Sequence, residues 1–358
     1  MRNYNIAVIP GDGIGIEIIP EGVKVLNTAI EVTGSCELKF EFFPWGSSYY
    51  LKYGRMMPDD GLKILEGFDA IYFGAVGFPT VPDHISLPGL RLRICQNFDQ
   101  YANIRPSMLL PGVKSPLRDK QAANIDFIVI RENTEGEYSG AGGRIHQGLP
   151  FEIALGTSVF TRHGVERIIR YAFELAKSRP RKKLISATKS NAQKHTFGLW
   201  DEIFNDIRND YPEVITEQVL IDALAARMVL RPESLDVIVA SNLFADILTD
   251  LGGAICGSLG VAPSANLNPE RRYPSMFEPI HGSAPDIFGK GIANPIAMIW
   301  SGAMMLEFLD EHNASELILS AIRTVTATGQ ILTPDLGGKS TTCEVGNEIS
   351  KTLRNIAG

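Results

Sequence analysis

Two aspartates with helical spacing are the clearest candidates for metal chemistry in this sequence. Asp246 and Asp250 lie in "SNLFADILTDLGG", directly after the strand-like run "DVIVAS". Residues four positions apart share one face of a helix, so both carboxylates can reach one hard cation such as Mg²⁺ or Mn²⁺. A lone pair of this kind is more often a solvated helix face. Here the surrounding apolar side chains leave little fully exposed surface.

Four further side chains are candidates on their residue type and position. Arg105 in "ANIRP" and Arg131 in "VIREN" carry guanidinium groups that suit carboxylates, although surface ion pairs would explain them equally well. Tyr138 ends "RENTEGEY", and Lys189 ends the strand-like run "LISATK". Taken alone, the tyrosine and the lysine are more typical of structural roles.

The glycine-rich opening "IPGDGIG" resembles a nucleotide-binding loop but does not match one. Gly11 and Gly13 fit the first two positions of GxGxxG, whereas the third position is Ile16. The GK[ST] of a Walker loop is also missing from this stretch. The spacing therefore predicts a tight turn between a strand and a helix, and not a Rossmann site.

Composition restricts the partners and the compartment. The 358 residues suggest about two domains, and the formal net charge of −7 argues against nucleic acid and anionic membranes. The four cysteines are widely spaced, which suits free thiols in a reducing compartment. The start "MRNYNIAVIP" lacks the apolar core of a signal peptide, and the most apolar stretch, 296–309, is too short to span a bilayer. We expect a cytoplasmic protein.

The elements that must position these residues alternate between strands and helices, which predicts an α/β fold with a substantial parallel sheet. After Thr161, a helix should bury one face. This face carries Val165, Ile168, Ile169, Ala172 and Ala176. Residues 139–150 are glycine-rich and predict a projecting loop or hairpin. Residues 261–295 are rich in proline and asparagine, and we expect a long functional loop there.

Several motifs together resemble the β-decarboxylating dehydrogenases, the family of isocitrate, isopropylmalate, tartrate and D-malate dehydrogenases. The resemblance runs nearly end to end. It rests on "IPGDGIG", "FDQYANIRP", "VIRENTEGEYSG", "ATKSN", "SNLFADILTDLGG" and "FEPIHGSAPDIFGKGIANP". "RENTEGEYSG" and "APSANLNPER" look most similar to the tartrate and D-malate branch.

The resemblance implies a two-lobed isocitrate/isopropylmalate dehydrogenase-like fold with a parallel-rich mixed sheet. Residues 1–104 plus 258–358 would form the cofactor-side domain. Residues 105–257 would form the central domain, with the dimer interface and an arm. The active cleft would lie between the lobes of a homodimer that shares its active sites.

The resemblance also assigns catalytic roles. Asp246 and Asp250 would bind the metal together with Asp222 of a second subunit. Asp222 would also be one of the catalytic residues. Lys189, also from the second subunit, would help to remove the proton of the 2-hydroxyl. Tyr138 would protonate the enol that decarboxylation leaves. Arg105 and Arg131 would bind the substrate carboxylates.

The cofactor implied by the resemblance is NAD. Asp286 would accept hydrogen bonds from the adenosine ribose and repel the 2′-phosphate of NADP. Glycine and small residues near it would let adenosine pack on the backbone. The full expected set is Ile14, Asn191, Glu278, His281, Gly282, Ser283, Ala284, Pro285, Asp286, Ile287 and Asn294.

One position departs from the family pattern. The family usually carries a further arginine ten residues before the one in "NIRP", and this chain has Cys95 there. Arg91 lies one helical turn before Cys95 if the segment is a helix, and Arg93 is also near. We hypothesise that Arg91 or Arg93 supplies the missing contact. Alternatively, the substrate needs one fewer ionic contact.

The implied activity is NAD- and divalent-metal-dependent oxidative decarboxylation of a malate-type 2-hydroxy acid, with D-malate or tartrate preferred. Loss of CO₂ places charge on the keto oxygen, which Mg²⁺ or Mn²⁺ stabilises, and a monovalent cation such as K⁺ is a further possible cofactor. The alternatives are 3-isopropylmalate or a related 3-substituted malate as substrate. A more distant alternative is a non-catalytic regulatory subunit. A subunit without catalysis, however, has no chemical need for these aspartates and the lysine together.

Overall fold

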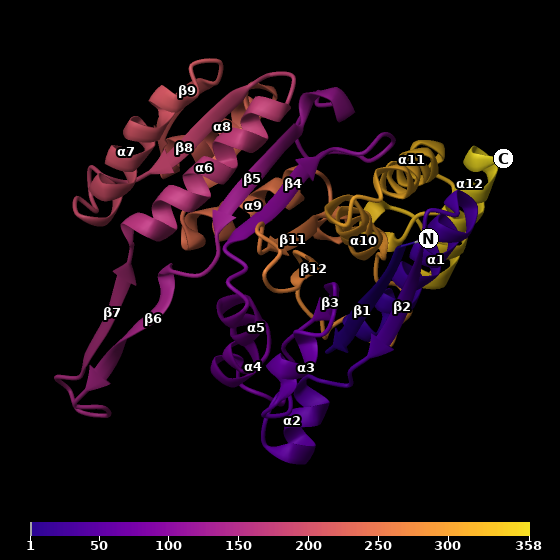
Figure 1. Cartoon of the computed structure of the whole chain (residues 1–358), viewed down its shortest axis with the longest axis horizontal. Helices are drawn as coiled ribbons and strands as arrows, with labels where there is room; N and C mark the ends of the chain where they lie inside the picture. The colour runs from indigo at the N-terminus through magenta and orange to yellow at the C-terminus, as the bar shows by residue number, and fades with distance from the viewer. Residues whose placement is uncertain (1) are drawn as a thin grey trace.

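A mixed sheet of ten strands runs through the computed structural model, which describes residues 2–358. Its strand order is β2-β1-β3-β12-β11-β4-β5-β10-β8-β9 (Figure 1). The strands are β1 (Arg2–Gly11), β2 (Cys36–Phe42), β3 (Ala70–Ala75), β4 (Ala102–Met108), β5 (Asp126–Glu132), β8 (Lys183–Thr188), β9 (Ile215–Leu220), β10 (Val237–Ala240), β11 (Pro263–Leu267) and β12 (Ser275–Pro279).

Strand direction changes only in the middle of the sheet. The strands from β2 to β12 pair in parallel, as do those from β5 to β9, whereas β12-β11, β11-β4 and β4-β5 are antiparallel. The expected parallel-rich mixed sheet is therefore confirmed. The proposed domain boundary after residue 104 falls within β4, between the two parallel halves.

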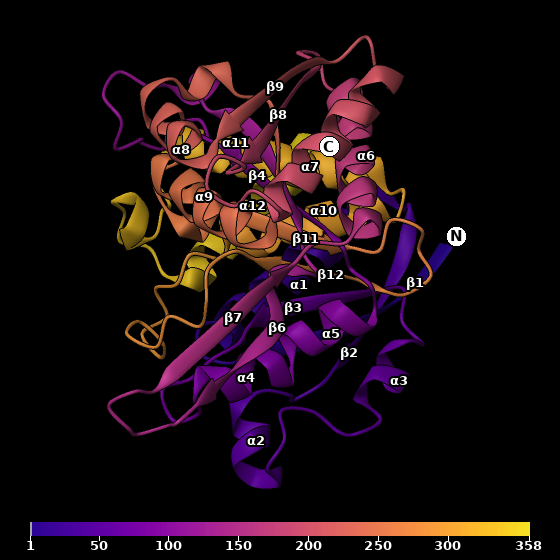
Figure 2. The same cartoon turned by 90° about the vertical axis from the view of Figure 1, so that its left-hand side faces the viewer.

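Helices cover the sheet and connect its strands (Figures 1 and 2). Helices α1, α10, α11 and α12 pack together beside the half of the sheet that runs from β2 to β11. Helix α6 packs on β5 and β10, in the other half. Their bounds are α1 (Gly15–Thr33), α2 (Ser47–Tyr53), α3 (Gly61–Leu65), α4 (Asp83–Gly89), α5 (Arg91–Asn97), α6 (Arg162–Ser178), α7 (Thr196–Ile207), α8 (Ile221–Leu230), α9 (Asn242–Ile255), α10 (Ile296–Phe308), α11 (His312–Thr328) and α12 (Thr342–Ala357).

Local sequence explains how α6 and α10 are placed. The side chain of Thr161 caps α6 by accepting a hydrogen bond from the backbone of Gly164, and the predicted apolar face of α6 is fully buried. Helix α10 is apolar on nearly all sides and is buried. Within residues 2–358, no helix combines the length and apolarity needed to cross a membrane.

The glycine-rich segment forms a hairpin, as predicted. Strands β6 (Gly136–Ile145) and β7 (Ile153–Val159) pair only with each other and extend away from the large sheet (Figure 1).

All four cysteines are free, and Cys343 alone among them is exposed.

The prediction of a long loop over 261–295 was wrong in its first half. This segment contains β11 and β12, which lie in the centre of the sheet, and only residues after Pro279 form an irregular connection to α10. The two strands are five residues each and contain asparagine, proline and glutamate, so their alternation is hidden from a periodicity argument. Their polar residues point to the candidate site.

Candidate active site

Polar residues form a row across the centre of the sheet. In the register of the antiparallel strands, Glu278 lies opposite Ser264, Asn266 opposite Asn103, and Asn103 opposite Arg131. Residues that face each other across paired strands point to the same side of a sheet. The fold therefore collects these side chains, which are far apart in the sequence, on one face.

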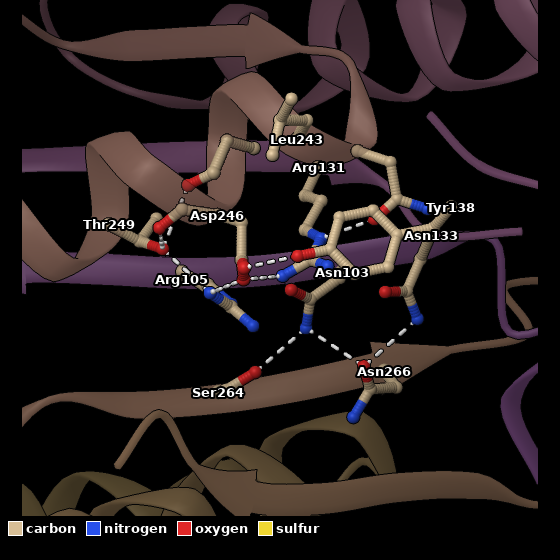
Figure 3. A network of polar contacts seen from close by, with 12 residues as sticks. Asn103, Arg105, Arg131, Asn133, Tyr138, Leu243, Asp246, Thr249, Ser264 and Asn266 are labelled. Atoms are coloured by element: carbon tan, nitrogen blue, oxygen red, sulfur yellow. Dashed lines mark hydrogen bonds and ion pairs between the residues drawn. The ribbon is translucent and has the colours of Figure 1, made fainter. Parts of the chain in front are cut away.

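Side-chain amides join this row into a hydrogen-bond network (Figure 3). Nδ2 of Asn103 donates to Oγ of Ser264 at 2.7 Å and to Oδ1 of Asn266 at 3.0 Å. Nδ2 of Asn133 also donates to Oδ1 of Asn266, and Nδ2 of Asn266 donates to Glu278 at 2.7 Å. Because buried polar atoms need partners, this network holds the row in one arrangement.

Two arginines, Arg105 on β4 and Arg131 on β5, meet the carboxylate of Asp246 on α9. Nη1 of Arg105 donates to Oδ1 of Asp246 at 3.2 Å and to Oγ1 of Thr249 at 2.6 Å. Nη1 of Arg131 pairs with the same oxygen of Asp246, and its Nε donates to Asn242 at 2.9 Å. Nε of Arg105 is buried without a partner among residues 2–358, so this guanidinium retains donor capacity for a ligand.

Tyr138 completes the surroundings of Asp246. Its hydroxyl donates to Oδ2 of Asp246 at 2.8 Å, and the guanidinium of Arg131 lies 5.3 Å from the centre of its ring (Figure 3). The predicted residues Arg105, Arg131, Tyr138 and Asp246 thus come together from β4, β5, β6 and α9.

These contacts set the protonation states of the cluster. Burial alone would raise the pKa of Asp246, but Arg131 and Arg105 outweigh it and hold this pKa below its usual value. Burial raises the pKa of Tyr138, and the hydrogen bond to Asp246 raises it further. At neutral pH the cluster therefore contains a charged carboxylate beside a phenol that keeps its proton.

An ion pair lies at the other end of the same pocket. The guanidinium of Arg91, at the start of α5, contacts Oε1 of Glu278 at 2.7 Å, and both side chains are largely buried. Burial opposes the charge on Arg91, but Glu278 raises the pKa of that guanidinium above its usual value. Cys95 is fully buried, one turn further along α5, and neither Cys95 nor Arg93 lines the pocket.

The pocket between these groups has a volume of about 180 Å³. Three guanidinium groups face two carboxylates inside it, so the pocket favours an anionic ligand. The rest of the lining combines the polar side chains of Tyr138 and His281 with apolar side chains and backbone. Its lining residues are Ala75, Val76, Leu87, Arg91, Leu92, Arg105, Arg131, Tyr138, Asp246, Glu278, Pro279, Ile280, His281 and Gly282.

An open groove of about 540 Å³ continues from the pocket. One wall is the expected segment Gly282–Pro285, to which Ile14 is tied by a 2.9 Å hydrogen bond from its backbone N–H to the carbonyl of Ser283. The opposite wall, residues 76–83, follows β3 and was missed by sequence reasoning. The signal that could have found it is the glycine- and proline-rich stretch "VGFPTVPD" at the carboxyl end of a strand, where open α/β sheets bind ligands.

The other expected cofactor residues have separate surroundings. Asp286 is exposed, and its carboxylate has no partner among residues 2–358. Nδ2 of Asn294 donates to Asp335 at 3.0 Å, so this amide is already engaged. Ile287 is half-buried next to the groove segment, whereas Asn191 is exposed and lies beside Lys189, away from the pocket lining.

The expected metal ligands are only partly brought together. Asp250 is exposed one turn after Asp246 on α9, and burial and then repulsion from Asp246 raise the pKa of its carboxyl. Lys189 and Asp222 pair with each other at 2.5 Å outside the pocket, and 65% of the Asp222 side chain is exposed. In the described part of a single chain, no three His, Cys, Asp or Glu side chains gather in a way that could hold a metal.

Sequence comparison places this geometry in a family. Residues 5–349 match the isocitrate/isopropylmalate dehydrogenase family. The chain belongs to this family. The chain is therefore an enzyme of the dehydrogenase type. The family expected from the sequence motifs and the expected fold class are both confirmed.

Individual relatives support the same placement. A D-malate dehydrogenase (decarboxylating) from Escherichia coli is 57% identical over 99% of this chain and 99% of its own length. A probable tartrate dehydrogenase/decarboxylase from Agrobacterium vitis is 56% identical over 99% of this chain and 98% of its own. The crystal structure of isocitrate dehydrogenase from Methylococcus capsulatus has a TM-score of 0.87 at 34% identity, covering 98% of this chain and 99% of the other.

Proposed function

We propose that this protein catalyses the NAD- and divalent-metal-dependent oxidative decarboxylation of a malate-type 2-hydroxy acid, with D-malate or tartrate as the preferred substrate. The observation that carries the proposal is the convergence of Arg105, Arg131 and Tyr138 on Asp246 in a small, cation-rich pocket. The names of the D-malate and tartrate relatives support the substrate class.

The donor set of α9 fits a hard divalent cation. Asp246 and Asp250 offer carboxylate oxygens from one helix face, and burial together with repulsion from Asp246 raises the pKa of Asp250 despite the nearby Arg105 and Arg131, so a bound cation would relieve this repulsion. Mg²⁺ and Mn²⁺ commonly retain water or substrate oxygens, so two carboxylates from one chain plus Asp222 from a second copy are sufficient. When bound, the metal acts as a Lewis acid on the oxygen that becomes negative as CO₂ leaves.

The groove fits a dinucleotide. Residues Gly282–Pro285 form a wall of small side chains, and a Cβ built on Gly282 meets no atom within 4 Å, so this wall is open to a ligand. The exposed carboxylate of Asp286 is free to accept hydrogen bonds from ribose hydroxyls and would repel a 2′-phosphate, which favours NAD over NADP. When bound there, NAD would supply the acceptor for the hydride that leaves C2 of the substrate.

The side chains of the chain itself do the remaining work. Arg105 and Arg131 bind the substrate carboxylates through their forked donors, and the unpaired Nε of Arg105 gives one donor for this purpose. Tyr138 holds a proton on its hydroxyl and delivers it to the carbon from which CO₂ has left. Lys189 and Asp222, supplied by a second copy of the chain, approach the 2-hydroxyl and the metal.

A 3-substituted malate such as 3-isopropylmalate is the second candidate substrate, because one side of the pocket is apolar. Val76, Leu87 and Leu92 line it next to Arg91. An alkyl group on C3 would gain burial there, whereas the Arg91–Glu278 pair offers hydrogen bonds to a hydroxyl or carboxylate.

The deciding experiment is NADH formation at 340 nm with Mn²⁺ across D-malate, L- and meso-tartrate, 3-isopropylmalate and isocitrate. Matched reactions contain EDTA, Mg²⁺ in place of Mn²⁺, K⁺ in place of Na⁺, and NADP in place of NAD. We expect metal-dependent turnover of D-malate or tartrate with NAD. Turnover of 3-isopropylmalate alone would select the second candidate, and no turnover with any acid would refute both.

A further inference from the structure

The turn after β1 holds a buried carboxylate that the proposed reaction does not use. Asp12 is 4% exposed and lies between Gly11 and Gly13, whose φ angles of 69° and 53° are in the left-handed region. Gly11 has no room for a side chain, since an added Cβ would lie 1.8 Å from the carbonyl oxygen of Ala75. The turn is therefore packed tightly against the end of β3.

Three donors converge on the carboxylate of Asp12. Oδ1 accepts from the backbone N–H of Ser47 at 2.7 Å, and Oδ2 accepts from the hydroxyl of Ser47 and the backbone N–H of Gly77, both at 2.8 Å. No cationic side chain pairs with Asp12 within residues 2–358. A carboxylate has acceptor sites for all three donors, whereas an amide has one oxygen and would turn its NH₂ toward a donor.

The partners of this turn are the two walls of the groove. Gly77 belongs to the wall formed by residues 76–83. The backbone N–H of Gly77 donates to the carboxylate of Asp12, so Asp12 holds this wall in place. Two residues later, Ile14 is bonded to Ser283 in the opposite wall. A single short turn therefore fixes both sides of the groove.

A second contact links the same two segments. The rings of Phe78 and Phe288 lie edge to face with their centres 6.2 Å apart, so an aromatic residue just past Gly77 packs on one just past the Gly282–Pro285 wall. The separation of the walls is thus sensitive to where the backbone of Gly77 sits.

We propose that Asp12 is a positioning residue for the dinucleotide: it sets the spacing of the groove walls and does not itself contact the reacting atoms. This inference rests on the proposed function, in which the groove holds NAD. It separates the affinity for the cofactor from the chemistry in the neighbouring pocket, because Asp12 contacts none of Arg105, Arg131, Tyr138 or Asp246.

The test is Asp12→Asn in the full-length protein, with NADH binding measured by calorimetry and by the fluorescence of bound NADH. We expect the dissociation constant for NADH to rise about tenfold or more, since a hydrogen bond to a charged group is lost and a donor faces a donor. The KM for the hydroxy acid and kcat at saturating NAD should change less than about twofold. Amide hydrogen exchange should speed up at residues 76–79.

Two controls separate this role from a general loss of stability. Asp69→Asn alters an exposed carboxylate at the other end of β1, which accepts from the backbone of Asn5 at 2.7 Å, and NADH affinity should not change. Ser47→Ala removes one of the three bonds to Asp12 and should weaken NADH binding by a smaller factor than Asp12→Asn. It also serves as the deciding variant if Asp12→Asn does not fold.

The outcomes distinguish the inference from the function on which it rests. Wild-type protein that binds no NADH would overturn the proposed cofactor and the positioning role together. Wild-type protein that binds NADH, with unchanged affinity in folded Asp12→Asn or, failing that, in Ser47→Ala, would overturn the positioning role alone. A lower melting temperature with unchanged affinity would likewise assign Asp12 a purely structural role.

Discussion

The hydroxyl of Tyr138 donates a 2.8 Å hydrogen bond to Oδ2 of Asp246, while two arginines pair with the other oxygen of the same carboxylate. The arginines keep Asp246 charged, and burial together with this hydrogen bond keeps Tyr138 protonated. One carboxylate therefore orients a proton donor and leaves two guanidinium groups aimed at the same pocket. A site arranged in this way suits a reaction that binds an anion and ends with a proton transfer.

The variant Tyr138→Phe tests the proton donor. It retains the ring on which Arg131 packs, so folding and substrate affinity should change little. We expect kcat to fall by about 10² to 10⁴, the usual contribution of a positioned general acid, with KM nearly unchanged. Steady-state NADH formation at several substrate concentrations measures both constants.

Tyr101→Phe is the matched control for that variant. Tyr101 also donates a hydrogen bond to a carboxylate, at 2.9 Å to Glu270, but it does not line the pocket. Its removal should leave kcat near the wild-type value. Equal losses in the two variants would show that the hydroxyl of Tyr138 has no special part in the reaction.

Asp250→Asn should stabilise the metal-free protein while abolishing metal-dependent turnover. Because the pKa of Asp250 is raised in the fold, ionising this carboxyl costs more in the folded than in the unfolded chain, which destabilises the fold at neutral pH. A neutral amide removes this cost, which is well below about 1 kcal/mol because the side chain is exposed and screened by water. The gain should disappear as the pH falls through the pKa of Asp250, where the wild-type carboxyl becomes neutral too.

Thermal unfolding of the wild type and of Asp250→Asn in EDTA, at neutral pH and at pH 3, measures whether the variant is more or less stable than the wild type. A rise of about one or two degrees is expected at neutral pH only. With Mn²⁺ added, the wild type should have the higher melting temperature, since it gains stability from the bound ion and the variant does not. An unchanged response of Asp250→Asn to Mn²⁺ would contradict the assignment of Asp250 to the metal.

Much of this arrangement follows from local sequence signals. The α6 helix, the β6–β7 hairpin and the buried α10 helix are all predictable, because each is specified by the spacing of apolar residues or glycines within its own segment. The pair Asp246 and Asp250 is predictable for the same reason, since i and i+4 lie on one helix face. The tight turn at Gly11 and Gly13 also follows from local backbone requirements.

The centre of the sheet could not be predicted in this way. Strands β11 and β12 are short and polar on the face that bears Asn266 and Glu278, and only pairing with β4 and β3 makes them strands. Similarly, nothing near Arg91 in the sequence indicates that its partner is Glu278, 187 positions later. Contacts of this range depend on strand order, which one sequence without relatives does not reveal.

Arg91, and not Arg93, should replace the arginine that Cys95 displaces. Arg91 lines the pocket and is held by Glu278, whereas Arg93 points elsewhere on the short helix α5. Arg91→Lys keeps a positive charge for Glu278 but loses the forked donor, so we expect the KM for the hydroxy acid to rise about tenfold. Arg93→Ala should leave KM unchanged.

A melting curve accompanies each of these variants. Arg91→Ala, which leaves Glu278 buried without its partner, should lose about 3 to 5 kcal/mol of stability. Arg91→Lys should lose much less, so its kinetics remain interpretable. If Arg91→Lys and Arg93→Ala both keep the wild-type KM, the pocket binds its substrate without a contribution from an arginine of α5.

Hybrid dimers test whether each active site is shared by two copies of the chain. Lys189 and Asp222 pair with each other and do not line the pocket that holds Asp246, so in the proposed function a second copy supplies them. Lys189→Met and Asp246→Asn should each be inactive, yet co-expressed they should recover about a quarter of the wild-type activity, because half of the dimers are hybrids with one intact site. Asp246→Asn with Asp250→Asn is the matched control and should recover nothing, since both residues come from the same copy. Recovery in neither pair would place every catalytic group within a single chain.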